Sequence, residues 1–189
     1  MRKLTLVFFL MLTIAPVVSP QEPAKPTISI TQDISLSEWN KLAYRQLKDW
    51  LQKSAEKMPE QDYDFKPNET ARQYGEIVGH LADIQYRFCS IVRGDNNGGP
   101  SIEKTKTTKA DLIIALKEAF AYCDPAYDGM TDASANDMVK LAQNQTPKIS
   151  VLSMNIAHLS LHYGSLVSYM RMKNIVPPST EEIVRAPEK

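Results

Sequence analysis

The longest periodic segment of the chain reads ISVLSMNIAHLSLHYGSLVSYMRMK and spans residues 149–173. Apolar residues recur in it at intervals of three and four, which is typical of an amphipathic α-helix. Asn174 and the pair Pro177-Pro178 predict where this helix ends, because proline cannot continue a helix. The predicted inner face consists of Val151, Met154, His158, His162, Ser165, Leu166 and Tyr169.

Three upstream segments show the same period. The first begins at Ser35, which forms a capping box with Glu38. The second begins at Thr70, and the third runs from Thr108 to the pair Asp124-Pro125. Their predicted inner rows are, in order, Leu36, Trp39, Ala43, Leu47, Trp50 and Leu51; Ile77, His80, Ile84, Phe88 and Ile91; and Leu112, Leu116, Ala119, Phe120 and Cys123.

These segments predict an all-α fold, a four-helix bundle with long connections. Connections of this length can cross the bundle, so a simple up-down order is not implied. One short extended piece is predicted, at about residues 137–141. The aspartates of the last connection, Asp124, Asp128, Asp132 and Asp137, do not have the spacing of a calcium loop, so a solvated loop is the favoured interpretation.

The N-terminal residues differ from the rest of the chain. Arg2 and Lys3 precede an apolar or small run that is too short to span a bilayer comfortably, so residues 1–20 are predicted to be a signal peptide. The protein is therefore expected to be secreted or periplasmic, without stable membrane insertion. The predicted organisation continues with a flexible lead-in at 21–33, the bundle at 34–180 and a C-terminal tail at 181–189.

Charge and cysteine content narrow the function. The 189 residues carry 22 basic and 22 acidic side chains, a balance that gives nucleic-acid binding no support. Export would place Cys89 and Cys123 in an oxidising compartment, where they form either one disulfide or two buried free thiols. The sequence alone does not define an oligomeric state, so it neither establishes nor excludes a homodimer.

The chain has three histidines, and all of them lie on predicted inner rows. His158 and His162 are four residues apart on one helix, which places both rings on the same face. His80 lies on a different helix whose inner row faces the bundle interior. Three imidazoles that converge favour one divalent transition metal ion over calcium or magnesium. Glu76, Asp83 and Asn155 are candidates for a fourth ligand, a base or a supporting acceptor, although Glu76 and Asp83 fit a solvated position better.

Two motifs resemble those of the DinB-like (DinB/YfiT) family. They are GEIVGHLAD at residues 75–83 and AHLSLHYGSL at residues 157–166. The resemblance covers about residues 35–180, and segments around Cys89, Lys109 and Cys123 are similar to a secreted branch of metal-dependent enzymes. It implies a four-helix bundle with His80, His158 and His162 as ligands of zinc, nickel or iron, the identity of the metal being open.

Members of this family include transferases and isomerases that use low-molecular-weight thiols, and proteins described as metal-dependent hydrolases of unknown substrate. The resemblance therefore implies a metal-dependent hydrolase or transferase acting on a small molecule, with catalytic residues unknown. The alternatives are a non-catalytic metal-binding module and a structural bundle whose histidines fill the core. Two departures from the pattern are the predicted export, since thiol cofactors are cytosolic, and Ser165, where an amide is expected.

Overall fold

The computed structural model describes the backbone of residues 33–95 and 98–185. Side chains are described for residues 33–95 and 98–181. The predicted signal peptide and nearly all of the predicted lead-in lie outside the described residues. From Ile34 onward the chain forms one compact unit. Among the described helices, none has an apolar stretch of the length that a bilayer crossing requires.

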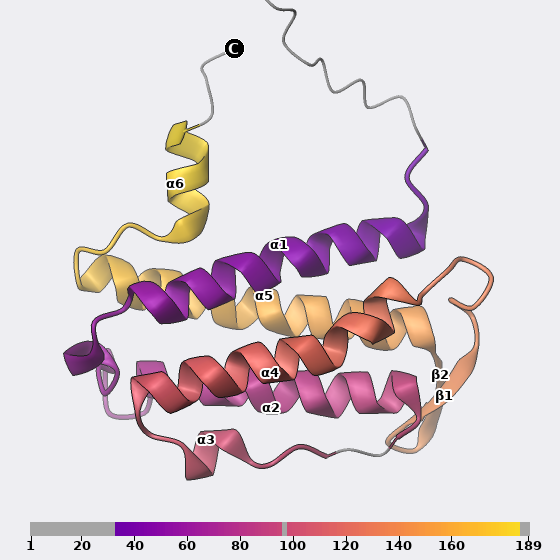
Figure 1. The fold of residues 1–189 in the computed structure, drawn as a ribbon, viewed down its shortest axis with the longest axis horizontal. Helices are drawn as coiled ribbons and strands as arrows, with labels where there is room; N and C mark the ends of the chain where they lie inside the picture. The colour runs from indigo at the N-terminus through magenta and orange to yellow at the C-terminus, as the bar shows by residue number, and fades with distance from the viewer. Residues whose placement is uncertain (1–32, 96–97, 186–189) are drawn as a thin grey trace, which may run out of the picture. The chain divides into compact units, whose positions relative to one another are not determined.

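Four long helices form the bundle, as predicted: α1 (Leu36–Lys57), α2 (Tyr74–Arg93), α4 (Lys109–Asp128) and α5 (Lys148–Met172). Helix α2 packs against α4 and α5, and α1 packs against the same two helices. The helices α1 and α2 therefore lie diagonally across the bundle although they follow one another in the chain (Figure 1). The prediction of an all-α bundle is confirmed for the described residues, and the diagonal placement of α1 and α2 answers the question of helix order that the sequence left open.

Short elements occupy the connections. The connection after α2 returns along the bundle and carries the short helix α3 (Ile102–Thr105), so α4 begins near the same end as α2 (Figure 1). The extended piece predicted near 137–141 is strand β1 (Met138–Leu141), which pairs antiparallel with β2 (Asn144–Pro147). A 3₁₀ turn, η1 (Glu60–Asp62), follows α1, and helix α6 (Pro178–Arg185) begins near the predicted tail.

The predicted start of α2 at Thr70 is wrong by one turn. The side-chain oxygen of Asn68 accepts hydrogen bonds from the backbone N–H groups of Thr70 and Ala71, each at 3.0 Å, and holds them in a turn. The helix begins at Tyr74, where Gln73 and Glu76 form the capping box, with the Gln73 N–H donating to Glu76 at 2.7 Å.

The predicted end of α4 at Asp124-Pro125 is also wrong, because the helix continues through Pro125 to Asp128. Neighbouring helices hold the turn that precedes the proline. The Tyr44 hydroxyl donates to the carbonyl of Phe120, and the Arg93 guanidinium donates to the carbonyl of Tyr122. Tertiary contacts therefore outweigh the cost of proline inside this helix.

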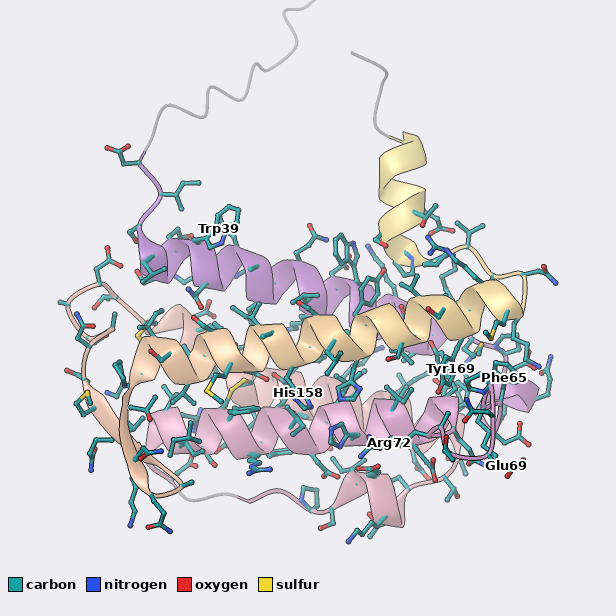
Figure 2. The ribbon with its side chains drawn as sticks, turned by 180° about the vertical axis from the view of Figure 1, so that it is seen from behind. Trp39, Phe65, Glu69, Arg72, His158 and Tyr169 are labelled. Carbon is teal, nitrogen blue, oxygen red and sulfur yellow. A yellow bond between two sulfur atoms is a disulfide. The ribbon has the colours of Figure 1, made fainter. Side chains whose placement is uncertain are left out.

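The buried face of α1 differs from the predicted row. Leu36 and Trp39 are exposed by 59% and 60%, and Trp39 projects from the outside of α1 (Figure 2). The helix instead buries a row that starts with two polar residues: Ser37, Asn40, Tyr44, Leu47, Leu51, Ser54 and Ala55. The two polar residues at its start have partners, since the Ser37 N–H donates to Asp132 and the Asn40 side chain accepts from Ser153. The buried hydroxyl of Ser54 has no hydrogen-bond partner among the described residues.

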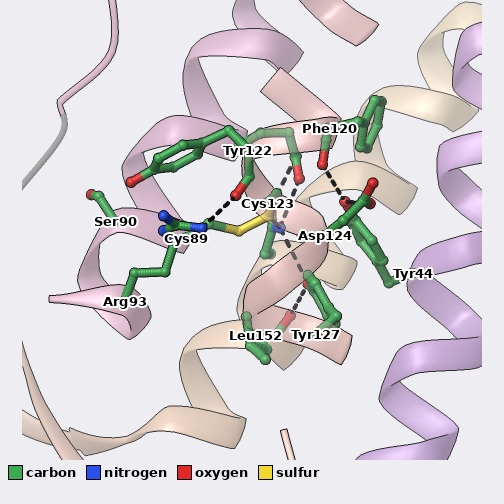
Figure 3. Close-up of a disulfide and its surroundings, with 12 residues drawn as sticks. Tyr44, Cys89, Ser90, Arg93, Phe120, Tyr122, Cys123, Asp124, Tyr127 and Leu152 are labelled. Carbon is green, nitrogen blue, oxygen red and sulfur yellow. Dashed lines mark hydrogen bonds between the residues drawn. A yellow bond between two sulfur atoms is a disulfide. The ribbon is translucent and has the colours of Figure 1, made fainter. Parts of the chain in front are cut away.

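A buried polar cluster and a disulfide join α2, α4 and α5 at one level of the bundle. Cys89 and Cys123 form a disulfide with a Cα–Cα distance of 5.3 Å (Figure 3). Asn155 and Gln85 exchange hydrogen bonds of 3.0 and 3.2 Å between their side-chain amides, and Asn155 also donates to the Tyr127 hydroxyl at 3.2 Å. The sequence left two alternatives for the cysteines, one disulfide or two free thiols, and in the structure they form the disulfide.

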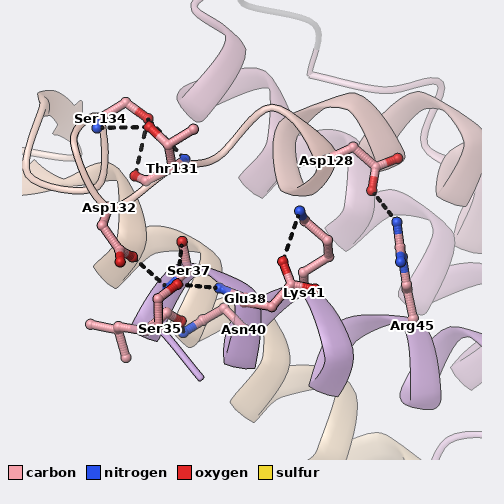
Figure 4. Close-up of polar contacts among 11 residues, drawn as sticks. Ser35, Ser37, Glu38, Asn40, Lys41, Arg45, Asp128, Thr131, Asp132 and Ser134 are labelled. Atoms are coloured by element: carbon pink, nitrogen blue, oxygen red, sulfur yellow. Dashed lines mark hydrogen bonds and ion pairs between the residues drawn. The ribbon is translucent and has the colours of Figure 1, made fainter. Parts of the chain in front are cut away.

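The four aspartates of the predicted solvated loop each contact a different partner. Asp124 accepts from Lys48, and Asp128 pairs with Arg45 at 2.8 Å (Figure 4). Asp132 accepts from the backbone of Ser37, and Asp137 pairs with Lys148 at 3.0 Å. The first three carboxylates connect this region to α1, whereas Asp137 contacts the start of α5, and the four do not converge on a common point.

Candidate metal centre

The three histidines meet at the seam between α2 and α5. The Nε2 atom of His158 lies 3.0 Å from Nε2 of His80 and 3.1 Å from Nε2 of His162. One ring nitrogen from each histidine lies within 4.8 Å of the others. All three side chains are half-buried, so the site opens at the edge of the bundle and not at its centre, which corrects the predicted inner-row position.

The hydrogen-bonding capacity of imidazole does not account for this arrangement. Each ring nitrogen has one in-plane position, which holds either a proton or a lone pair. The Nε2 of His158 faces two other Nε2 atoms and therefore cannot make a well-directed hydrogen bond to both. A cation can accept all three lone pairs, and two nitrogens bound at about 2.1 Å in a tetrahedral site lie about 3.4 Å apart, close to the observed separations. The donor set and its spacing fit a transition metal ion.

The electrostatic environment keeps two of the rings neutral at physiological pH. Burial, together with the neighbouring His80, lowers the pKa of His158. Burial, followed by His158 and His80, lowers the pKa of His162 to about 4. Since metal ions bind the deprotonated ring nitrogen, these shifts favour the form that a metal requires.

Glu103 is a site residue that sequence reasoning missed. Its Oε2 atom lies 2.9 Å from Nδ1 of His80, the ring nitrogen that faces away from the other two histidines. The carboxylate also accepts from Nε of Arg72 at 2.7 Å through its second oxygen. Burial raises the pKa of Glu103, but the hydrogen bonds from Arg72 and His80 outweigh it, so the net shift is downward and the group is anionic.

Two residues beside His80 place Glu103. Asp83, one turn along α2, accepts hydrogen bonds from the backbone N–H groups of Ile102 and Glu103 at 2.7 and 3.0 Å. Gly79 leaves room for α3, since a Cβ atom there would lie 2.8 Å from the Cα of Glu103. The absence of a side chain at Gly79 was the signal in the sequence that another backbone approaches this face of α2.

The other predicted candidates do not join the three rings. Glu76 accepts from the backbone of Gln73 in the capping box of α2, and Asp83 caps α3 and supports the site only through Glu103. Asn155 is fully buried and belongs to the polar cluster beside the disulfide. Ser165 donates to the carbonyl of Leu161 within its own helix.

A cleft of about 890 Å³ shares Arg72 and Glu103 with this region. Its lining also includes Tyr63, Gly75 and Leu112 and charged side chains such as Lys104. No histidine is among its described lining residues. The cleft is large enough for a small molecule and adjoins the site through the Arg72–Glu103 pair.

Sequence comparison identifies the family. The profile of the DinB superfamily matches residues 43–166, which is most of the chain. The chain belongs to the DinB superfamily. The matched region of this DinB-superfamily protein includes all three histidines and Glu103, so the site lies within the part of the chain that defines the family.

Similar proteins share the DinB fold at low sequence identity. The uncharacterized protein YjoA of Bacillus subtilis (strain 168) is 24% identical over 120 residues, covering 62% of this chain and 77% of YjoA. Its crystal structure has a TM-score of 0.62 and 19% identity, covering 75% of this chain and 96% of that one. A DinB-like protein from Bacillus cereus ATCC 10987 has a TM-score of 0.64 and 14% identity, covering 75% and 95%.

A mycothiol-dependent maleylpyruvate isomerase shows the same fold at greater distance. Its TM-score is 0.56 and its identity 13%, with 69% of this chain and 60% of that chain covered. At this level of identity the likeness shows a shared fold, and the protein that shares it is an isomerase.

Proposed function

We propose that His80, His158 and His162 bind one divalent transition metal ion and that the protein uses it for hydrolysis or group transfer on a small molecule. The observation that carries the proposal is the meeting of three Nε2 atoms at one point, with separations of 3.0 and 3.1 Å around His158. Zinc, nickel and iron all accept three imidazole ligands.

The chain would supply the binding geometry and an open coordination sphere. Two histidines one turn apart on α5 and a third on α2 occupy one side of the common point. A bound ion of this kind polarises a substrate and lowers the pKa of a coordinated water or thiol. Because all three histidines are partly exposed, the site can be reached from the surface.

Two observations support a small molecule as the substrate. The cleft of about 890 Å³ beside Arg72 and Glu103 is of the size that takes small ligands. The isomerase among the structural neighbours is described as dependent on mycothiol, a small thiol. Homodimer formation and the lack of nucleic-acid binding stay predictions.

We further propose that the protein is exported and works in an oxidising compartment. The charged and apolar pattern of residues 1–20 supports this location. The Cys89–Cys123 disulfide supports it as well, because structural disulfides persist in secreted and periplasmic proteins.

Elemental analysis of the purified protein beside a His162→Ala variant tests the proposal. We expect about one equivalent of metal in the wild type and none in the variant. A panel of esters, amides and thiol conjugates then tests the metal-loaded protein for turnover. Full metal content without turnover would favour a binding module, and a melting temperature that zinc or nickel leaves unchanged would favour a structural bundle.

A further inference from the structure

We propose that Glu103 is a positioning residue of the three-histidine site, which holds His80 as the Nδ1–H tautomer with its Nε2 lone pair turned toward His158. The role in metal affinity rests on the proposed function. The role in selecting the tautomer concerns the metal-free protein and can be tested without any metal.

The contact between Glu103 and His80 determines the tautomer. An ionised carboxylate only accepts hydrogen bonds, so the His80 nitrogen at 2.9 Å must donate. A neutral imidazole that carries its proton on Nδ1 has a bare Nε2. That Nε2 is the atom 3.0 Å from His158, so the carboxylate prepares the nitrogen that faces the other rings.

His80 needs this support more than the other two histidines. His158 and His162 lie four residues apart on α5, and the helix itself fixes the spacing of their side chains. His80 comes from α2, so its ring must be oriented across the helix–helix seam. Its Nδ1 contact to Glu103 is the interaction that restrains the ring from the side away from the site.

Two residues hold Glu103, and a third leaves room for it. Arg72 donates to its free oxygen at 2.7 Å. Asp83 accepts from its backbone N–H and from that of Ile102, which anchors the start of α3 on α2. Gly79 allows the approach, since α3 could not lie so close to a residue with a side chain. Hydrogen bonds to Arg72 and Asp83, together with the space at Gly79, thus place one carboxylate next to His80.

Nitrogen-15 NMR of the histidine rings in metal-free protein tests the tautomer. The variants are Glu103→Gln and Glu103→Ala, and Glu69→Gln is the matched control, since Glu69 is an exposed glutamate whose partner is Lys66 (Figure 2). We expect His80 to be protonated on Nδ1 in the wild type and in the control, and to shift toward Nε2 protonation in Glu103→Ala. A wild-type His80 protonated on Nε2, or an unchanged tautomer in Glu103→Ala, would overturn the proposal.

Zinc affinity, measured by competition with a chromophoric chelator, tests the consequence. Loss of an outer carboxylate partner weakens metal binding by roughly 10- to 100-fold, so we expect that decrease in Glu103→Ala and none in Glu69→Gln. Equal affinity of Glu103→Ala and wild type would contradict the positioning role. A wild type that binds no zinc, nickel or iron would refute the proposed function, while the NMR result would still decide the tautomer.

Circular dichroism and thermal unfolding of each variant without metal provide the folding control. The Glu103 side chain is 26% exposed, so its replacement leaves no fully buried cavity. An Arg72→Ala variant keeps the carboxylate and removes one of its anchors. It is expected to weaken zinc binding less than Glu103→Ala does, because the carboxylate still contacts His80. A larger effect than that of Glu103→Ala would contradict the assignment of Glu103 as the residue that positions His80.

Discussion

The same two helices, α2 and α5, build two polar clusters of opposite character. At one level Gln85 and Asn155 are fully buried, and their amides satisfy one another. About one turn away, His80 and His158 are half-buried, and their Nε2 atoms lie 3.0 Å apart, with the Nε2 atom of His162 at 3.1 Å from that of His158. The first cluster is complete within the protein, whereas the second presents three imidazoles as the donor set of the proposed metal site.

This difference indicates which polar residues serve stability and which serve function. A buried polar group that has partners stabilises and specifies the fold. Clustered imidazole nitrogens at a partly exposed position are instead the kind of donor set that a transition metal ion binds. The two clusters therefore predict opposite responses to mutation: the amide and disulfide region should affect unfolding, and the histidines should affect metal binding.

The largest expected change in stability follows from removing the disulfide. Replacing Cys89 and Cys123 with alanine opens a loop of 34 residues, which should lower the free energy of unfolding by about 3 to 4 kcal/mol. Urea denaturation of metal-free protein measures this. Zinc affinity of the folded variant should be unchanged, because Glu103 has anchors of its own. A parallel loss of zinc affinity would show that the two clusters are coupled.

The second prediction concerns the histidine cluster. At a hundredfold excess of zinc over its dissociation constant, the wild type should gain about 2.7 kcal/mol of stability. His158→Ala should abolish this gain, because the ring that faces both other histidines is gone. Without zinc the variant should unfold within about 1 kcal/mol of wild type. Denaturation with and without zinc separates these effects, and an undiminished zinc response would argue against the site.

The third prediction returns to the amide cluster. Asn155→Ala leaves the buried Gln85 amide without its partner and should cost about 2 kcal/mol in both the presence and the absence of zinc. The double variant with leucine at both positions is the control, since removing both polar partners should recover part of the loss. A changed zinc increment in Asn155→Ala would contradict the separation of the two clusters.

The helices were predictable because their signals are local. Ser35 and Thr108 accept hydrogen bonds from the backbone at the starts of α1 and α4, as their spacing to Glu38 and Asp111 predicts. The position of the buried row on α1 was not predictable in the same way. Asn40 is polar but buried and Trp39 is apolar but exposed, because the partners that decide between them come from distant segments.

The residues of the candidate site likewise fall into those that local pattern predicts and one that it does not. The pairing of His158 with His162 follows from helix geometry, and the approach of His80 follows from its row on α2. Glu103 reaches His80 only because the connection after α2 runs back along the bundle (Figure 1). Gly79 signals that some backbone approaches this face of α2, but no local pattern says which segment it is, so the sequence alone could not assign Glu103 to the site.

The Gly79→Ala substitution has the smallest expected effect and tests the approach of α3 to α2 directly. The new Cβ atom would lie 2.8 Å from the Cα of Glu103, and overpacking of this kind costs roughly 1 to 3 kcal/mol. Alanine in place of glycine within a helix returns about 1 kcal/mol, so the net loss of stability should be near 1 kcal/mol. The displaced α3 should carry Glu103 away from His80 and weaken zinc binding more than this stability change implies. If zinc affinity stayed at the wild-type value while stability fell, the approach of α3 would matter for packing alone.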